Sequence, residues 1–533
     1  MNGVQLLLII VGGIAVSAIA HRRGVQPGLV VVILAAAASF IPGMPRLELD
    51  SELILAVVVP PLLYSATRTA SFSGFSQNLW PILTLGVTLV VLTTGAAGLV
   101  GSWLMPAIGL PAALLLGAVL APPDTITTVT HGDELGLPRR VTAILTGESL
   151  VNDATALTLF GLAAAAAGAE ETLFDNAFGL FAYTAVTGLV VGAVFAVIAL
   201  WLRPRLHNPV LETSLALLLP FTAFLTAEQI HASGILAVVC CAFSFSVNTT
   251  LDPKHQYASA YRTRLQEDSV WPVLDFLLET FVFAYIGLQL RFVIADLAHA
   301  AAKPGLSITL ISAAVLLVTV IVFRVAAVWV MFTWWDMRRR AVERRMAGDS
   351  RFRERAMRRA QGRLKRRRFG QAAGEWTGPL GAPTPRESLI VGWTGMRGIL
   401  TLAAAAAVPH TLHNGEEFPG RDAIQAIALF VTLGTLLIQG TTIRALVRRL
   451  DVDTAGERRR AAELLERGKD LVWGAVTHGG PPTAADFDAQ RTAVVSAVMR
   501  GELDDDTARV LVHDVDLRQA AESHLARKEP VES

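Results

Sequence analysis

Charged residues are scarce in this 533-residue chain: Asp, Glu, Lys and Arg make up 17%, whereas soluble proteins contain about a quarter. Hydrophobic residues make up 53%, which argues against a water-soluble architecture. The net charge is +1, whereas nucleic-acid-binding proteins are typically strongly basic. There are two cysteines, Cys240 and Cys241, and because they are adjacent in an apolar segment they cannot bridge distant parts of a fold.

Long apolar segments are what the chain has instead. A bilayer core about 30 Å thick requires roughly 20 apolar residues in a helix, and thirteen segments meet or approach that length. We therefore expect an all-α polytopic membrane protein with about 13 transmembrane helices. The segments begin near Val4, Gly28, Glu52, Leu79, Gly109, Pro138, Phe174, Asn208, Ala232, Val270, Gly305, Glu387 and Ala423.

The distribution of Lys and Arg predicts the orientation of the spans. Loops rich in these residues stay in the cytoplasm, and here they alternate with loops that have few of them. The N-terminus is therefore expected outside and the C-terminus in the cytoplasm. The Lys and Arg residues of the other set of loops are only Arg46, Arg291, Lys303 and Arg421.

Two polar segments interrupt or follow the apolar ones and divide the chain. Residues 336–386 form a basic loop between the eleventh and twelfth spans, suited to anionic lipid headgroups or serving only as a solvated topology anchor. Residues 451–533 alternate apolar and charged residues at helical spacing, which predicts a small cytoplasmic helical tail. Residues 1–450 would then be the transmembrane domain.

Few charged residues lie inside the spans, and the acids outnumber the bases. Arg324 and Arg397 are the two bases there. Because a charge at membrane depth is costly, each should face the protein interior and have a partner. Structural salt bridges account for part of this set, but the excess of carboxylates indicates a bound cation or proton. The acids well inside the spans are Asp124, Glu148, Asp153, Asp275 and Glu279.

The fifth span contains a helix break. Pro122 and Pro123 remove two amide donors and obstruct the preceding turn, and Asp124 follows them directly. Transporters use broken helices as ion sites because freed carbonyls and helix ends face the ion. Thr125 follows the aspartate, and its hydroxyl group either offers an oxygen to an ion or bonds back to its own helix.

The twelfth span contains glycines at every third position around an arginine. Gly392, Gly395 and Gly398 permit close helix crossing and easy unwinding, and Arg397 lies among them. The loop charges give the fifth and twelfth spans opposed directions. Two interruptible segments in opposed directions are typical of the inverted repeats of secondary transporters.

The sixth span contains Glu148, Ser149, Asn152 and Asp153 between apolar residues. Glu148 and Asn152 are four residues apart and share a helix face. Asp153 is turned by about 100° from Asn152 and can face a different neighbour. The spacing therefore allows one acid to be paired permanently with an arginine while the other exchanges ligands.

These segments together make the chain resemble the monovalent cation:proton antiporter-1 family, of the sodium/proton exchanger type and in its bacterial form. The resemblance covers roughly residues 5 to 450. It implies thirteen spans in the bacterial plasma membrane, a homodimer, and a mobile core bundle that holds the ion between crossed, unwound fifth and twelfth helices. Its most specific carriers are Glu148-Ser149-Leu150-Val151-Asn152-Asp153, the break at Asp124, Pro60-Pro61-Leu62-Leu63-Tyr64, and Gly395-Met396-Arg397-Gly398.

The resemblance also implies roles for the site residues. Asp153 looks like the carboxylate that alternately binds the cation, as a transported Na⁺, and the proton. Asp124 and Asn152 look like supporting site residues, and Ser149 and Thr125 would add hydroxyl oxygens. An Asn-Asp pair, here Asn152-Asp153, resembles the electroneutral branch of the family.

The remaining charges would hold the core together. Glu148 looks like the structural acid and Arg324 like its basic partner, while Arg397 lies near the same core and is a second candidate to share Glu148. The chain departs from the family at Pro123, where many members have a threonine, so that hydroxyl group cannot contribute.

The expected function is exchange of a monovalent cation, Na⁺ first, for a proton, with no cofactor and no nucleic acid involved. K⁺/proton antiport is the nearest alternative, and a cation channel or a membrane sensor with buried titrating acids is a more distant one. An enzyme is not expected, because the spans contain no Ser/His/Asp set and no histidine cluster of the kind that binds metals.

Overall fold

The structure is a computed structural model that describes residues 3–22, 27–43, 51–70, 74–75, 78–124, 137–168, 177–251, 260–298, 304–348, 384–452, 454–476 and 482–528. Within these residues the regular elements are helices, which confirms the predicted all-α class. Seven of the described helices are long and apolar enough to cross a membrane, and shorter apolar helices accompany them. Most predicted segment starts fall within a few residues of a helix start, and the one near Phe174 lies outside the described residues.

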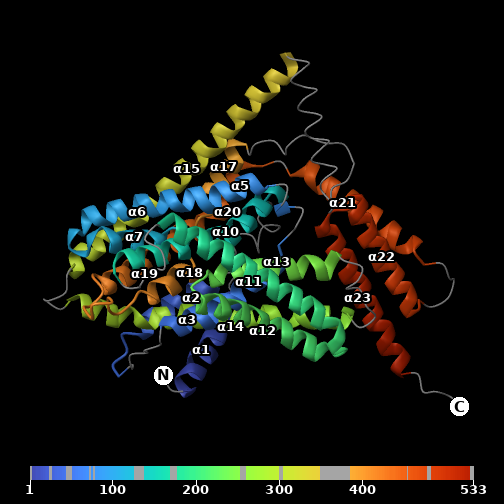
Figure 1. Ribbon diagram of the computed structural model, residues 1–533, viewed down its shortest axis with the longest axis horizontal. Coiled ribbons are helices and arrows are strands. Elements are labelled where there is room, and N and C mark those ends of the chain that lie inside the picture. The colour runs from blue at the N-terminus through green and yellow to red at the C-terminus, as the bar shows by residue number, and fades with distance from the viewer. Residues whose placement is uncertain are drawn as a thin grey trace.

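The first of two helix bundles contains the N-terminal helices and the middle of the chain. Its core contains small and branched apolar side chains, among them Val31, Ala223 and Val238, together with aromatic ones such as Trp271. Figure 1 shows α3, α12 and α14 together in its lower half. The helices are α1 (Gly3–Arg22), α2 (Pro27–Ala38), α3 (Ser51–Arg68), α11 (Ala177–Leu206), α12 (Pro209–Gln229), α13 (Gly234–Leu251) and α14 (Ala260–Ala298).

The second bundle combines the fourth to sixth spans with the last three. Leu116, Val320 and Ile427 contribute to its core from three different helices. Figure 1 shows α6, α7 and α15 above the first bundle. The elements are α5 (Leu79–Leu83), η1 (Thr84–Leu89), α6 (Val90–Leu104), η2 (Pro106–Ile108), α7 (Gly109–Leu120), α10 (Arg139–Ala166), α15 (Leu306–Gly348), α17 (Pro385–Trp393), α18 (Ile399–Ala406), α19 (Arg421–Thr435), η4 (Leu436–Gly440) and α20 (Thr441–Leu450).

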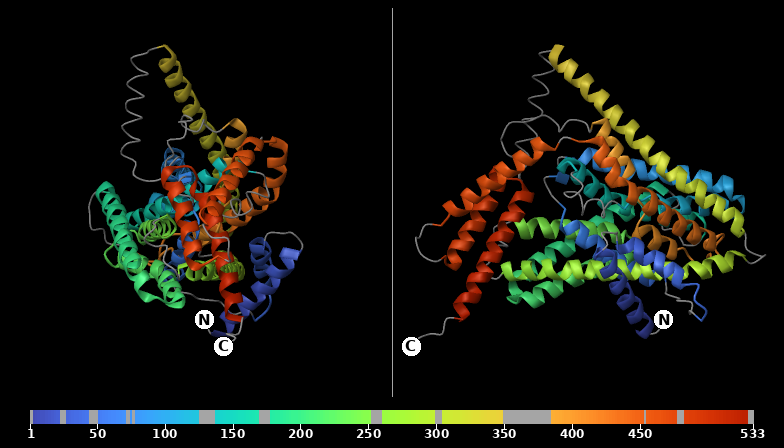
Figure 2. Two further views of the ribbon diagram at one scale, coloured as in Figure 1. Left: turned by 90° about the vertical axis from the view of Figure 1, so that its right-hand side faces the viewer. Right: turned by 180° about the vertical axis from the view of Figure 1, so that it is seen from behind.

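Two helices extend further than the apolar segments indicated. α14 begins at Ala260 rather than near Val270, because its polar first turns are held by partners such as the buried Arg203, which lies 3.1 Å from Glu267. α15 continues to Gly348, into the segment predicted to be a loop from residue 336. An Asp336–Arg340 ion pair of 2.6 Å, four residues apart, supports that extension. Figure 2 shows α15 projecting beyond the bundle.

Local sequence signals explain several helix starts. Thr384 caps α17 in a capping box with Glu387, and Pro385 occupies the first turn. Glu387, an acid near a span end, therefore has a local structural role. Asn208 caps α12 by accepting a hydrogen bond from the backbone N–H of Val210.

The C-terminal helices α21 (Ala455–Gly474), α22 (Ala484–Arg500) and α23 (Asp505–Lys528) form a small bundle with its own apolar core. It lies at one end of the molecule (Figures 1 and 2). Arg264 of α14 donates two hydrogen bonds to the buried Asp516 of α23, at 2.6 and 2.8 Å. Arg509 donates to the backbone oxygens of Thr69 and Ala70 at the end of α3. The tail therefore packs on helices of the first bundle.

Candidate functional site

The helix breaks of the fifth and twelfth spans meet inside the second bundle. α7 ends at Leu120, and α17 and α18 are separated by the segment from Thr394 to Gly398. The backbone N–H of Asp124 donates to the carbonyl oxygen of Met396 at 2.6 Å, an isolated antiparallel bridge between the two breaks. The prolines at 122 and 123 thus stand in an unwound segment, as their chemistry requires.

Glycine is required where these segments touch. A Cβ atom on Gly398 would overlap the carboxylate of Asp124, and one on Gly395 would overlap the side chain of Arg324. The glycine spacing of the twelfth span therefore brings the backbone against two charged side chains. Close approach, rather than a special backbone angle, is what these positions demand.

Glu148 and Arg324 form an ion pair inside the second bundle. Arg324 Nη1 donates to Glu148 Oε1 at 2.6 Å and Nη2 donates to Oε2 at 3.0 Å. Their side chains are 2% and 0% exposed for Arg324 and Glu148. Arg324 Nη2 also donates to the carbonyl oxygen of Val391 at 3.2 Å, which ties α10, α15 and α17 together.

Arg397, the second candidate to share Glu148, makes its side-chain hydrogen bonds to backbone carbonyl groups, whereas the ion pair of Glu148 is with Arg324. Arg397 Nε donates to the carbonyl oxygen of Leu120 at 2.7 Å and its Nη1 to that of Gly395 at 2.5 Å. Its backbone N–H donates to Thr435 Oγ1 at 3.0 Å. The physical reason is that a broken helix leaves carbonyl groups without amide donors, and a buried guanidinium group with five N–H donors can satisfy several of them.

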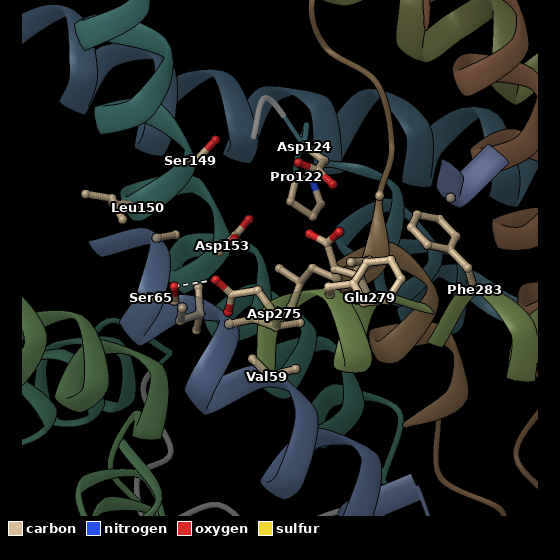
Figure 3. Close-up of a pocket in the computed structure, with 18 of the residues that line it drawn as sticks. Val59, Ser65, Pro122, Asp124, Ser149, Leu150, Asp153, Asp275, Glu279 and Phe283 are labelled. Atoms are coloured by element: carbon tan, nitrogen blue, oxygen red, sulfur yellow. Dashed lines mark hydrogen bonds between the residues drawn. The ribbon is translucent and has the colours of Figure 1, made fainter. Parts of the chain in front are cut away.

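The two consecutive residues Asn152 and Asp153 face different surroundings. Asn152 is buried, and its Nδ2 donates to the carbonyl oxygen of Pro123 at 2.8 Å, so the amide group holds the broken segment. Asp153 instead faces a cavity (Figure 3). The turn of about 100° between neighbouring helix positions produces this division.

The cavity has a volume of about 410 Å³ and lies between the two bundles. Asp124, Ser149 and Asp153 line it from the second bundle, while α14 contributes Asp275 and Glu279 from the first. Figure 3 shows the four carboxylates directed toward the same space. Thr125 lies outside the described residues.

The polar residues of the cavity that the sequence did not assign to a site include Ser65, Asp275 and Glu279. Ser65 Oγ donates to Asp275 Oδ2 at 2.5 Å. The sequence places both acids inside a span, and their spacing of four residues, which puts them on one helix face, is the signal that indicates a shared role. No group of three His, Cys, Asp or Glu side chains that could hold a metal ion is found among the described residues.

These features are those of a secondary transporter of cations. Two broken helices cross, the arginine charges are satisfied inside one bundle, and a cavity lined by carboxylates lies between the two bundles. The sequence model described as "Sodium/hydrogen exchanger, transmembrane" matches residues 6–449, and the chain belongs to that family of transporters.

Individual proteins agree with this assignment. A relative from Mycobacterium tuberculosis (strain ATCC 25618 / H37Rv), named as an uncharacterized Na⁺/H⁺ exchanger, is 30% identical over 450 residues, which cover 84% of this chain and 74% of the relative. A Bacillus subtilis (strain 168) protein named as a sodium, potassium, lithium and rubidium/H⁺ antiporter is 26% identical over 81% of this chain and 60% of its own. The fold is similar to the structure of the sodium proton antiporter MjNhaP1 from Methanocaldococcus jannaschii, with a TM-score of 0.56, 16% identity, and coverage of 84% and 97%.

Proposed function

We propose that the protein exchanges one monovalent cation, Na⁺ first, for one proton by competition of the two ions for Asp153. The observation that carries the proposal is the cavity at which Asp153 and Asp124 meet beside two crossed helix breaks. Family membership supports cation and proton antiport, and the cavity supplies the residues for it.

The competition follows from burial of the carboxylate. An ionised carboxyl group away from bulk water is unfavourable unless something neutralises it. Either a proton or a bound cation can neutralise the carboxylate. Once one of them is bound, the negative charge that attracts the other is gone. One group that accepts either ion, but not both, produces exchange if only the loaded site changes sides.

The two-bundle architecture suggests how the site changes sides. Asp124 and Asp153 belong to the second bundle, whereas the opposite wall of the cavity belongs to α3 and α14 of the first. We expect the second bundle to move against the first, carrying the loaded site between cytoplasm and exterior, as in other transporters with inverted repeats.

The partners of the polar groups near Asp153 favour an exchange of one cation for one proton in each transport cycle. Glu148 is held by Arg324, and the Asn152 amide is bound to the backbone of Pro123. This leaves Asp153 as the exchangeable acid of α10. Exchange of one cation for one proton moves no net charge, so the membrane voltage should do no work on the cycle.

Na⁺ and K⁺ are the two candidates for the transported cation. Pro123 has no hydroxyl group where related proteins often have one, which reduces the number of oxygens available to the ion. The Bacillus subtilis relative is named for four alkali cations, which supports transport of K⁺ alongside Na⁺ as the second candidate.

The test uses proteoliposomes with an internal pH dye and a clamped membrane voltage, to which each alkali cation is added in turn. Wild type should dissipate a pH gradient on addition of the cation, and Asp153→Asn should not. Asp296→Asn is a matched control, because Asp296 lies on α14 and outside the cavity lining. Exchange by Asp153→Asn at the wild-type rate would overturn the assignment.

Further expectations concern the surroundings of the transporter. We propose that residues 1–450 form the transmembrane domain of a homodimer in the bacterial plasma membrane, with residues 451–533 in the cytoplasm and the N-terminus outside. The basic segment 336–386 would contact anionic headgroups. Cysteine labelling from either side of sealed cells tests the orientation, and light scattering of the purified protein tests the dimer.

A further inference from the structure

Helix α14 presents two carboxyl groups to the cavity from the bundle opposite to Asp153. Asp275 and Glu279 are four residues apart, so they share one face of the helix, about 6 Å apart along its axis. Asp275 lies beside Ser65 of α3, and Glu279 lies one turn further along, toward Asp124 (Figure 3). The two acids therefore form a short ladder along the cavity wall.

Neither acid of the ladder has its hydrogen-bonding capacity satisfied by the protein. Asp275 Oδ2 accepts from Ser65, but its buried Oδ1 has no hydrogen-bond partner in the part of the chain that the structure describes. Glu279 faces the cavity with no hydrogen bond or ion pair to any described residue. Glu279 is the acid directed at the cavity (Figure 3), and because buried polar groups are normally satisfied, its carboxylate, which has no partner among the described residues, indicates a ligand that occupies the cavity.

The described basic side chains nearest to these acids have other partners. Of the described residues that line the cavity, Arg68 is the basic one, and it already binds Asp268 at 3.0 Å. Arg324 and Arg397 are bound inside the second bundle and do not line the cavity. The cavity therefore holds an excess of negative charge, which attracts cations and not an anionic substrate.

We propose that Ser65, Asp275 and Glu279 form a second binding site for a monovalent cation, here called the vestibule site, on the first bundle. The proposal rests on the proposed exchange function and deepens it. The vestibule site binds the cation with part of its water shell and delivers it to Asp153 on the second bundle. Oxygen atoms are the ligands that hard cations prefer, and the carboxylate and hydroxyl groups of the vestibule site supply them.

The vestibule site should set the affinity for the cation and leave the exchange step unchanged. Loss of one of two carboxylates near a cation path should raise the KM for Na⁺ about tenfold, which corresponds to about 1.4 kcal/mol. Because Asp153 still carries the ion across, the maximal rate should stay within about twofold of wild type.

The first experiment measures the Na⁺ dependence of exchange in proteoliposomes for wild type, Asp275→Asn, Glu279→Gln and the Asp296→Asn control. We expect a higher KM in the first two variants and the wild-type KM in the control. An unchanged KM in Glu279→Gln overturns the vestibule site but leaves the exchange function intact. A fall in maximal rate at constant KM also overturns it, because it assigns Glu279 to positioning or folding. A wild type that exchanges no cation overturns the proposed function itself.

The second experiment detects cation binding without transport. In the Asp153→Asn background, NaCl should raise the melting temperature of the purified protein in a saturable manner relative to choline chloride of equal ionic strength. Adding Glu279→Gln should abolish the difference between the two salts. If Asp153→Asn alone shows no difference, or if the double variant keeps it, the three residues do not bind a cation.

Discussion

Neutralising Glu148 should destabilise the protein because it strands the charge of Arg324. In the substitution Glu148→Gln one of the two hydrogen bonds of 2.6 and 3.0 Å is lost, because the amide nitrogen cannot accept from the guanidinium group, and the other goes to a neutral oxygen, while the guanidinium group stays 2% exposed. A guanidinium group cannot lose its proton in a protein. The charge of Arg324 therefore stays buried without an anion, and its remaining acceptors are the amide oxygen of the new glutamine and the carbonyl oxygen of Val391.

The expected magnitude comes from the burial of both partners. Removing one member of a buried ion pair costs about 3–5 kcal/mol. Glutamine retains one acceptor oxygen in the right place, so the lower end, about 3 kcal/mol, is the better expectation. Arg324→Met should cost less, because the remaining carboxyl group can take up a proton and become neutral. The double variant, which combines Glu148→Gln with Arg324→Met, buries neither charge of the pair and should be more stable than Glu148→Gln alone.

Thermal unfolding of the purified variants in detergent, at a single scan rate, checks this order. Glu148→Gln should lower the apparent melting temperature on the order of 5 °C, and comparison at one rate is needed because large membrane proteins unfold irreversibly. Glu463→Gln, at an exposed position of α21, serves as the control and should match wild type. A melting temperature for Glu148→Gln within a degree of wild type, or a double variant less stable than either single one, would refute the structural role of the pair.

Two further predictions test the crossing and the tail. Gly398→Ala places a methyl group onto the aspartate carboxylate it contacts and should reduce exchange more than tenfold, whereas Gly161→Ala on α10, which meets no atom within 4 Å, should keep the wild-type rate in the same dye assay. Asp516→Asn removes the anion that Arg264 and Arg491 share; it should release the C-terminal helices and speed their cleavage by trypsin, and an unchanged cleavage rate would mean that apolar contacts hold the tail by themselves.

The helix breaks could be predicted because proline and glycine act locally. Pro122 and Pro123 end a helix wherever they occur in one, and Gly395 and Gly398 mark a close approach whose partner the sequence does not name. The structure supplies that partner as the opposing break, through the bridge between Asp124 and Met396. Apolar runs likewise located most helix starts, since the bilayer sets their length and composition.

Partners that leave no mark in the sequence could not be predicted. Arg397 binds carbonyl groups of the backbone, and every residue has one, so counting acids and bases directed attention to Glu148 instead. The early start of α14 at Ala260 depends on ion pairs with another helix, such as the one between Glu267 and Arg203. The C-terminal extension of α15 is supported by an ion pair within its own polar end. The position of Glu279 opposite Asp153 is a consequence of how the two bundles meet, which no spacing within one helix specifies.

In the proposed cycle, coupling arises from the cost of moving Asp153 while it is empty. The cavity wall that the site must pass includes Val59, Leu62 and Phe283, which offer an ionised carboxylate no hydrogen bond from their side chains. An uncompensated buried charge costs several kcal/mol, and a cost of about 4 kcal/mol slows the crossing roughly a thousandfold. The vestibule acids stay behind on the first bundle and do not enter this cost. Replacing Asp275 should therefore change how readily the cation reaches the site and leave the ratio of cations to protons at its wild-type value.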